Sequence, residues 1–142
     1  MLPSGLPEHV ADGEELSRFL TQSNHYKSGM AKPAAFLPNP AFRNTSVFRM
    51  GNDPVRLQQT WNATVTNGRV LKAVAFFHAR DVRVARLEVE SEEPPPAHAN
   101  IEEWPWIEND PELQKAQQKE RAAELASRTT MREFTNPSES PP

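Results

Sequence analysis

The hydrophobic pattern of the chain is clearest between residues 69 and 80, where it predicts a central β-strand. The apolar side chains of this run alternate between two faces. One face carries Leu71, Ala73, Ala75 and Phe77, and the other carries Val70, Val74 and Phe76. A strand that is apolar on both faces is usually covered on both sides of its sheet. We therefore expect the domain to be built around this segment, with His78 and Arg80 leaving its end together.

Upstream of that run, the spacing of apolar residues predicts a short helix over residues 13–21. Asp12 occupies the N-cap position and Glu15 follows three residues later, as in a capping box. The apolar positions at helical spacing are Leu16, Phe19 and Leu20. We expect this apolar stripe to pack against the rest of the domain.

A strand and a second helix are predicted between these two segments. Residues 44–50 alternate between two faces, as a strand does. Asp53 and Pro54 are typical of an N-cap and a first helical position, and they predict a helix over about 54–63. An Asn-Gly pair at 67–68 predicts the turn that returns the chain to the central strand.

The alternation of apolar residues changes phase after the central strand. The apolar positions are Val82 and Val84 on even numbers, then Leu87 and Val89 on odd numbers. This slip predicts a turn or a single helical turn at 80–85 and a strand at 86–91. The proline-rich segment 92–96 then ends the sheet.

Residues 97–107 show no apolar period, and we expect a loop there. It contains two of the three tryptophans, Trp104 and Trp106. Because aromatic rings bury large areas, the loop is expected to pack back on the domain. The alternative is an exposed segment that uses both tryptophans to bind a protein partner.

The last helix is predicted over residues 109–128, with Asp110 as N-cap and Pro111 at the first helical position. Glu124 and Arg128 form a well-oriented i,i+4 pair near its end. Its apolar face is thin, so the helix either lies lightly on the domain or projects from it. Residues 129–142 are expected to be a disordered tail, and residues 1–11 a disordered lead.

Composition agrees with one small domain. The chain has 142 residues, of which 37% are hydrophobic and fourteen are proline, and its mean hydropathy is −0.71. These values indicate that part of the chain lies outside a packed core. The predicted fold class is α+β, with a small, mostly antiparallel sheet and short helices in a single domain over residues 12–108, followed by the C-terminal helix.

Several kinds of chemistry lack their usual residues. There is no cysteine, which excludes disulfides and thiolate metal sites, and the four histidines lack metal-ligand spacing. No glycine-rich phosphate loop or G-x-S-x-G motif is present. We therefore expect no metal and no cofactor. The N-terminus lacks signal-peptide features and no apolar run reaches membrane length, so a cytoplasmic protein without membrane contact is expected.

The net charge of −3 hides an uneven distribution. Residues 17–87 hold eleven of the sixteen Arg and Lys residues and only two acids, whereas both ends are acidic. Three explanations are open: the ends fold back and pair with the basic middle, the basic residues are scattered solvated charges, or the middle forms an anion-binding face. The candidate anion-binding residues are Arg18, Lys32, Arg49 and Arg80. The anionic partner would be a nucleotide or a nucleic-acid backbone, although a pI near 5.8 is unusual for a dedicated nucleic-acid binder.

Two histidines are candidates for acid–base catalysis, because imidazole titrates near neutral pH. His25 lies in the polar loop after the first predicted helix, and His78 lies at the end of the central strand. The structural alternatives are a surface histidine at His25 and a partly buried, hydrogen-bonded histidine at His78. If the strands that end at Arg49 and His78 pair, these side chains and Arg80 meet at one sheet edge.

Three stretches carry a resemblance to a group of small bacterial proteins with no assigned activity. They are Ser17-Arg18-Phe19-Leu20 with His25 and Lys32-Pro33, Ser46-Val47-Phe48-Arg49, and Pro96-Ala97-His98-Ala99-Asn100-Ile101 with Trp104-Pro105. The similarity covers about residues 15–125. It implies a bacterial origin and says nothing about chemistry.

Three functional hypotheses follow, and the sequence leaves open whether the protein is an enzyme. The first is a binding or accessory protein whose basic face meets an anionic partner. The second is an enzyme acting on a nucleotide or phosphorylated substrate, with His25 or His78 as acid or base and Arg49 and Arg80 holding phosphate. The third is a protein-interaction adaptor that uses Trp104, Trp106 and the C-terminal helix.

Overall fold

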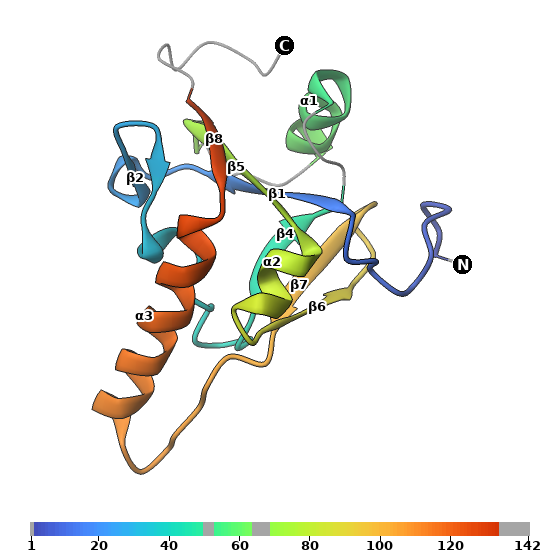
Figure 1. Ribbon diagram of the computed structural model, residues 1–142. Coiled ribbons are helices and arrows are strands. Elements are labelled where there is room, and N and C mark those ends of the chain that lie inside the picture. The colour runs from blue at the N-terminus through green and yellow to red at the C-terminus, as the bar shows by residue number, and fades with distance from the viewer. Residues whose placement is uncertain (1, 50–52, 64–68, 134–142) are drawn as a thin grey trace.

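The computed structural model describes residues 2–49, 53–63 and 69–133, which adopt an α+β fold (Figure 1). Six strands form one antiparallel sheet in the order β6-β7-β4-β1-β5-β8. The strands are β1 (Glu15–Leu20), β4 (Thr45–Phe48), β5 (Ala73–His78), β6 (Glu88–Ser91), β7 (His98–Glu102) and β8 (Thr130–Glu133). The predicted fold class, a mostly antiparallel sheet with short helices and a C-terminal helix, is therefore confirmed.

A small hairpin and five short or medium helices accompany the sheet in the described residues. They are η1 (Ser23–His25), β2 (Tyr26–Lys27), β3 (Met30–Ala31), η2 (Pro33–Ala35), α1 (Pro54–Ala63), α2 (Ala79–Val84) and α3 (Pro111–Ser127). The predicted N-caps of α1 and α3 are confirmed. Asp53 accepts hydrogen bonds from two backbone N–H groups of α1, at 3.0 and 3.3 Å. Asp110 accepts one from Leu113 at 3.1 Å.

Strand β5 confirms the prediction of a strand that is apolar on both faces. Ala73, Ala75 and Phe77 pack into one hydrophobic cluster, and Val74 and Phe76 pack into a second cluster on the opposite face. Leu71 was expected beside Ala73, but it packs into the second cluster. The strand begins only at residue 73, so the alternation does not extend back to Leu71.

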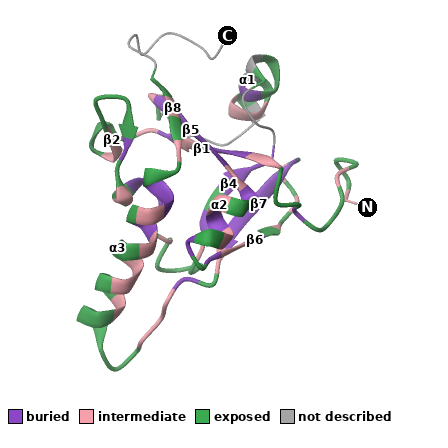
Figure 2. Ribbon diagram, in the orientation of Figure 1, coloured by how far each residue is buried: buried purple, intermediate pink, exposed green. Residues whose placement is uncertain are grey.

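Both faces of the sheet are covered, as expected for such a strand. On the first face, α2, α3 and the segment 31–36 pack together, and the buried residues include Val82, Leu125 and Phe36. On the second face, α1 contributes Leu57 and Trp61. Helices α1 and α3 lie at opposite corners of the view in Figure 1. In Figure 2, most of the inner strands between these two helices carry the colour of buried residues.

The predicted helix over residues 13–21 is wrong, because this segment forms β1. Leu16 and Leu20 are four residues apart, which suits a helix, but they also have the same parity and therefore share one face of a strand. Hydrogen-bonded partners on both sides decide the outcome. All six residues of β1 pair with β5, and Ser17 also lies opposite Phe48 of β4.

The loop predicted over residues 97–107 is also wrong in part, because residues 98–102 form the inner strand β7. The strand was missed because two of its buried residues, His98 and Asn100, are polar. The neighbouring predictions are confirmed. The strand expected over 44–50 is β4, the helical turn expected at 80–85 is α2, and the strand expected at 86–91 is β6.

The C-terminal part of helix α3 packs on the domain, and the rest of the helix projects from it. Only Ala122, Leu125 and Ala126 of this helix are buried, and the colour for buried residues lies at one end of α3 in Figure 2. Toward the helix start, Gln114 accepts a hydrogen bond from the N–H of Ile107 at 2.6 Å. Gln118 donates to the carbonyl of Pro105 at 2.8 Å. The expected ion pair between Glu124 and Arg128 is present at 3.7 Å.

Described segments near both ends of the chain contact the sheet. Val10, in the predicted disordered lead, is buried in the first cluster. Residues 130–133, which we assigned to the disordered tail, form the edge strand β8 beside β5. Residues 134–142 and the predicted turn at 67–68 lie outside the described residues. No helix in the described part of the chain is long and apolar enough to cross a bilayer.

Candidate functional site

The predicted basic residues do not form one face, because they lie toward opposite ends of β1. β1 and β5 run antiparallel, with Glu15 opposite His78 and Leu20 opposite Ala73. His78 and Arg80 therefore lie at the Glu15 end of β1. His25 follows the Leu20 end, and the backbone of Lys32 is hydrogen-bonded to it at 2.9 Å. β4 and β5 do not pair directly, since β1 lies between them.

Arg49 has a structural role instead of the predicted anion-binding one. Its side chain is buried, and each of its five N–H groups has an acceptor. Two donate to the Glu14 carboxylate at 2.9 Å each, and one donates to Ser91 Oγ at 2.8 Å. The other two donate to the carbonyls of Pro7 and His9. The Arg49 side chain thus connects the N-terminal segment to the sheet through hydrogen bonds, and it has no N–H group left to bind a ligand.

His78 and Arg80 belong to the start of α2. The backbone N–H of His78 donates to the Asp81 carboxylate at 2.8 Å, and the imidazole Nδ1 lies 3.8 Å from the same group. The side chain of Arg80 is exposed, and its backbone N–H donates to the carbonyl of Asp12 at 3.0 Å. Lys32 is exposed as well. These residues therefore lie on open surface at separate places.

The two tryptophans proposed for partner binding differ in exposure. Trp104 is 3% exposed and belongs to the first hydrophobic cluster. Its indole N–H has no hydrogen-bond partner among the described residues. Trp106 is partly buried, and the guanidinium of Arg43 lies 4.7 Å from its ring centre. The predicted packing of this segment on the domain is therefore observed, with only Trp106 reaching the surface.

Arg18 occupies the junction between β1 and β4. These two strands share a single paired position, Ser17 with Phe48, and the Arg18 side chain bridges them beyond that point. Its Nε donates to the carbonyl of Ala35 and its Nη1 donates to the carbonyl of Ser46, each at 2.8 Å. No carboxylate of the described residues lies within ion-pair distance of this guanidinium. Among the described residues, the partners of this guanidinium are therefore neutral carbonyls.

One side of Arg18 opens into a cleft of about 220 Å³, which we call the aromatic cleft. The residues that carry its chemistry are Arg18, His25, Arg69, Phe19, Phe48 and Trp61. Phe19 contacts Phe48 and Trp61 with ring centres 5.3 and 5.6 Å apart, the latter edge to face. Two of the predicted site residues, Arg18 and His25, thus meet here. Arg69 and the aromatic wall were not predicted as parts of the site.

The electrostatics of the aromatic cleft are positive. Desolvation by the surrounding protein, and then the charge of Arg69, lowers the pKa of Arg18 to about 10. Desolvation and then the charge of Arg18 also lower the pKa of His25. Both shifts have the direction expected where positively charged groups lie close together and are partly removed from water. At pH 7 they favour a neutral His25 beside a charged Arg18.

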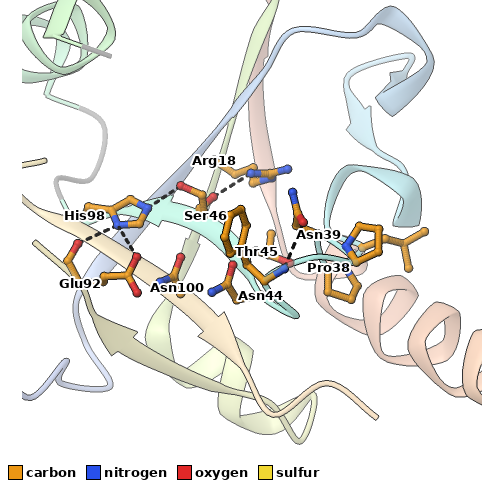
Figure 3. A pocket seen from close by; sticks show the side chains of 12 residues that line it. Arg18, Pro38, Asn39, Asn44, Thr45, Ser46, Glu92, His98 and Asn100 are labelled. Atoms are coloured by element: carbon orange, nitrogen blue, oxygen red, sulfur yellow. Dashed lines mark hydrogen bonds and ion pairs between the residues drawn. The ribbon is translucent and has the colours of Figure 1, made fainter. Parts of the chain in front are cut away.

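The other side of Arg18 borders a larger cleft of about 750 Å³, which we call the polar cleft (Figure 3). Ser46 Oγ lies 2.6 Å from His98 Nε2. His98 Nδ1 lies 2.8 Å from the carbonyl oxygen of Glu92 and 4.0 Å from its carboxylate. Asn44 and Asn100 line the same cleft. A hydroxyl, an imidazole and amide groups thus converge on one space.

The pairing of β4 with β7 creates this arrangement. Ser46 lies opposite Asn100 and Phe48 lies opposite His98, so all four side chains share one face of the sheet. The ring of Phe48 stacks edge-on against His98, with centres 5.3 Å apart. Ser46 and His98 were not predicted as site residues, because the segment that contains His98 was predicted to be a loop. The alternation of polar residues 98 and 100 with apolar residues 99 and 101 could have identified the strand.

The three stretches that carry the resemblance meet at this junction. Arg18 comes from the first stretch, Ser46 from the second and His98 from the third, and hydrogen bonds link them in that order.

Comparison of the chain with protein-family models, with curated proteins and with solved structures gives no match. Within the described residues, no group of three or more His, Asp or Glu side chains is arranged to hold a metal ion.

Proposed function

We propose that this protein binds a small anionic ligand, a phosphate ester or a carboxylate, in the aromatic cleft. The observation that carries this proposal is the guanidinium of Arg18, which is partly buried and has no carboxylate partner among the described residues. Removing a charge from water is costly unless an opposite charge compensates it. A bound anion would supply that compensation.

The geometry of Arg18 leaves donors available for such an anion. Nε and one N–H of Nη1 are used by backbone carbonyls, which hold the planar guanidinium in place. Its other N–H groups remain to form charge-assisted hydrogen bonds, and Arg suits phosphate and carboxylate oxygens by its forked geometry. Arg69 lines the same cleft and adds positive potential.

The aromatic wall narrows the ligand class. Phe19 and Trp61 are partly exposed and lie beside the cationic groups. Aromatic side chains stack on the planar rings of ligands, whichever hydrogen-bonding groups those rings carry. A ligand with a phosphate group and a planar ring, such as a nucleotide, satisfies both parts of the cleft. The observed burial of Trp104 favours this function over the adaptor hypothesis.

Calorimetric titration with AMP, adenosine and inorganic phosphate at constant ionic strength tests the proposal. AMP is expected to bind more tightly than either fragment alone. Arg18→Gln should weaken AMP binding about 10- to 100-fold, the value of one or two charge-assisted hydrogen bonds. Trp61→Ala should weaken it by a similar factor through lost stacking. Arg80→Gln is the matched control, because Arg80 is an exposed cation at the opposite end of β1.

Two results would contradict the proposal. One is the absence of AMP and phosphate binding at low salt by the folded wild-type protein. The other is an equal loss of affinity in Arg18→Gln and Arg80→Gln, which would indicate a diffuse effect of net charge. The bacterial origin and the cytoplasmic location expected from the sequence remain predictions.

A further inference from the structure

The polar cleft contains a serine–histidine pair that the anion-binding proposal does not use. Ser46 is exposed on β4, and its hydroxyl lies 2.6 Å from Nε2 of His98 on β7. His98 is 8% exposed, so its ring is held by the protein while the serine faces the cleft. Figure 3 shows both side chains directed toward each other across the two strands.

The hydrogen bonds of His98 select the tautomer of the neutral ring that a general base needs. A carbonyl oxygen only accepts hydrogen bonds, so the contact of 2.8 Å with the carbonyl of Glu92 requires the proton on Nδ1. The lone pair of the neutral ring is then on Nε2, facing the Ser46 hydroxyl. The Glu92 carboxylate lies 4.0 Å from the same Nδ1.

We propose that Ser46 and His98 act as a nucleophile and a general base that hydrolyse a carboxylic ester bound in the polar cleft. A nucleophile within hydrogen-bond reach of a base, whose other nitrogen is oriented by a third group, is the arrangement that activates serine in acyl transfer. In this protein the orienting group is a backbone carbonyl, and the carboxylate of the same residue lies behind it.

The walls of the polar cleft suit the two ends of an ester. The amide of Asn100 lies on the same face as Ser46 and makes no hydrogen bond to the other residues drawn in Figure 3. This amide provides a donor for the negative charge that develops on the carbonyl oxygen of the ester. The apolar side chains of Leu37, Pro38 and Phe42 line the same cleft and provide a surface for the acyl or alcohol group.

The reaction balances with water as the only co-substrate. Ser46 Oγ forms a bond to the acyl carbon while His98 Nε2 takes the hydroxyl proton. The alcohol leaves with that proton, and the acyl group remains on Ser46. Water then attacks the acyl carbon, His98 takes a proton from it, and the proton returns to Ser46 Oγ as the carboxylic acid leaves.

A covalent probe tests the pair directly. The folded protein is incubated with a fluorophosphonate, which loses fluoride when an activated serine attacks its phosphorus, and the modified residue is located by peptide mass spectrometry. Labelling is expected at Ser46. Ser46→Ala should abolish labelling at this position, and His98→Gln should lower the labelling rate by about 100-fold or more, the usual contribution of general base catalysis. Ser127→Ala is the matched control, because Ser127 is an exposed serine on α3 whose hydroxyl donates to a backbone carbonyl.

Hydrolysis of p-nitrophenyl acetate by the same proteins gives the second readout. Turnover should be lost in Ser46→Ala and retained in Ser127→Ala. The proposal is refuted if the folded wild-type protein shows no adduct at Ser46, or if it reacts no faster there than at Ser127. Because these results come from the wild-type protein, they remain decisive even if His98→Gln fails to fold.

The two proposals can fail independently. Fluorophosphonate labelling requires no nucleotide, and AMP binding requires no serine nucleophile. AMP binding without labelling at Ser46 would refute the ester hydrolysis and leave the aromatic cleft as an anion site. Labelling at Ser46 without AMP binding would refute the anion site alone.

Discussion

Replacement of Arg49 by Met is the most informative test of how the N-terminal segment is held. Arg49 is 3% exposed, and Arg49→Met removes a buried cation while leaving its acceptors in place. Those acceptors are both oxygens of the Glu14 carboxylate, the carbonyls of Pro7 and His9, and Ser91 Oγ. Breaking a buried ion pair on one side costs about 3–5 kcal/mol, because the other charge is left without its partner.

The size of the chain converts this cost into a temperature. For a protein of 142 residues, each kcal/mol corresponds to about 3–4 °C in Tm. Arg49→Met is therefore expected to lower Tm by roughly 10–20 °C. Arg49→Lys should recover only part of the loss, because an ammonium group cannot make the two parallel hydrogen bonds to Glu14.

Urea unfolding followed by tryptophan fluorescence measures the free energies of unfolding. Arg80→Met is the control, since Arg80 is exposed and its replacement should change the free energy of unfolding by less than about 0.5 kcal/mol. In a double-mutant cycle, Glu14→Gln and Arg49→Met should show a coupling energy of about 1–3 kcal/mol. A loss below about 1 kcal/mol in Arg49→Met would refute the structural role of this residue and reopen it as a ligand-binding one.

Three further predictions concern stability. Ser17→Ala should leave the free energy of unfolding unchanged or raise it by up to about 1 kcal/mol in urea titrations, because the buried Ser17 hydroxyl has no partner among the described residues; a clear loss would show that it does. Ile101→Ala in β7 should cost about 2–5 kcal/mol by the same method, whereas Phe42→Ala, at 74% exposure, should cost almost nothing; equal effects would contradict the burial of β7. Burial acts to raise the pKa of Glu93, but hydrogen bonds from Ser4 and from the N–H of Ala97 hold this pKa below its usual value. Its contribution is thus present above the unfolded-state pKa of about 4.3 and is lost as pH falls through the folded-state pKa. Glu93→Gln should be less stable than wild type at pH 7 and equally stable near pH 2, as measured by thermal unfolding, and a difference that persists in acid would contradict this.

The candidate site was only partly predictable. Arg18 and His25 were identified from their charge and chemistry, and they line one cleft in the structure. Ser46 and His98 were not predicted as a pair, because they are 52 residues apart and a local pattern carries no information about which strands will pair. Arg49 was assigned to an anion site on its residue type, although its five N–H groups are all used within the protein.

Local signals in the sequence determined those elements whose ends and faces depend on neighbouring residues. Asp53 with Pro54 and Asp110 with Pro111 specified where α1 and α3 begin, and the apolar run specified β5. β1 and β7 were decided only by tertiary structure. The spacing of Leu16 and Leu20 suits a helix and a strand alike, and the polar residues of β7 hide the apolar alternation of a strand. Pairing with neighbouring strands therefore decided the secondary structure of both segments. The polar cleft also depends on strand pairing, since the register of β4 on β7 places Ser46 beside His98. Strand register is fixed by the burial of a whole face of the strand, and no single residue determines it.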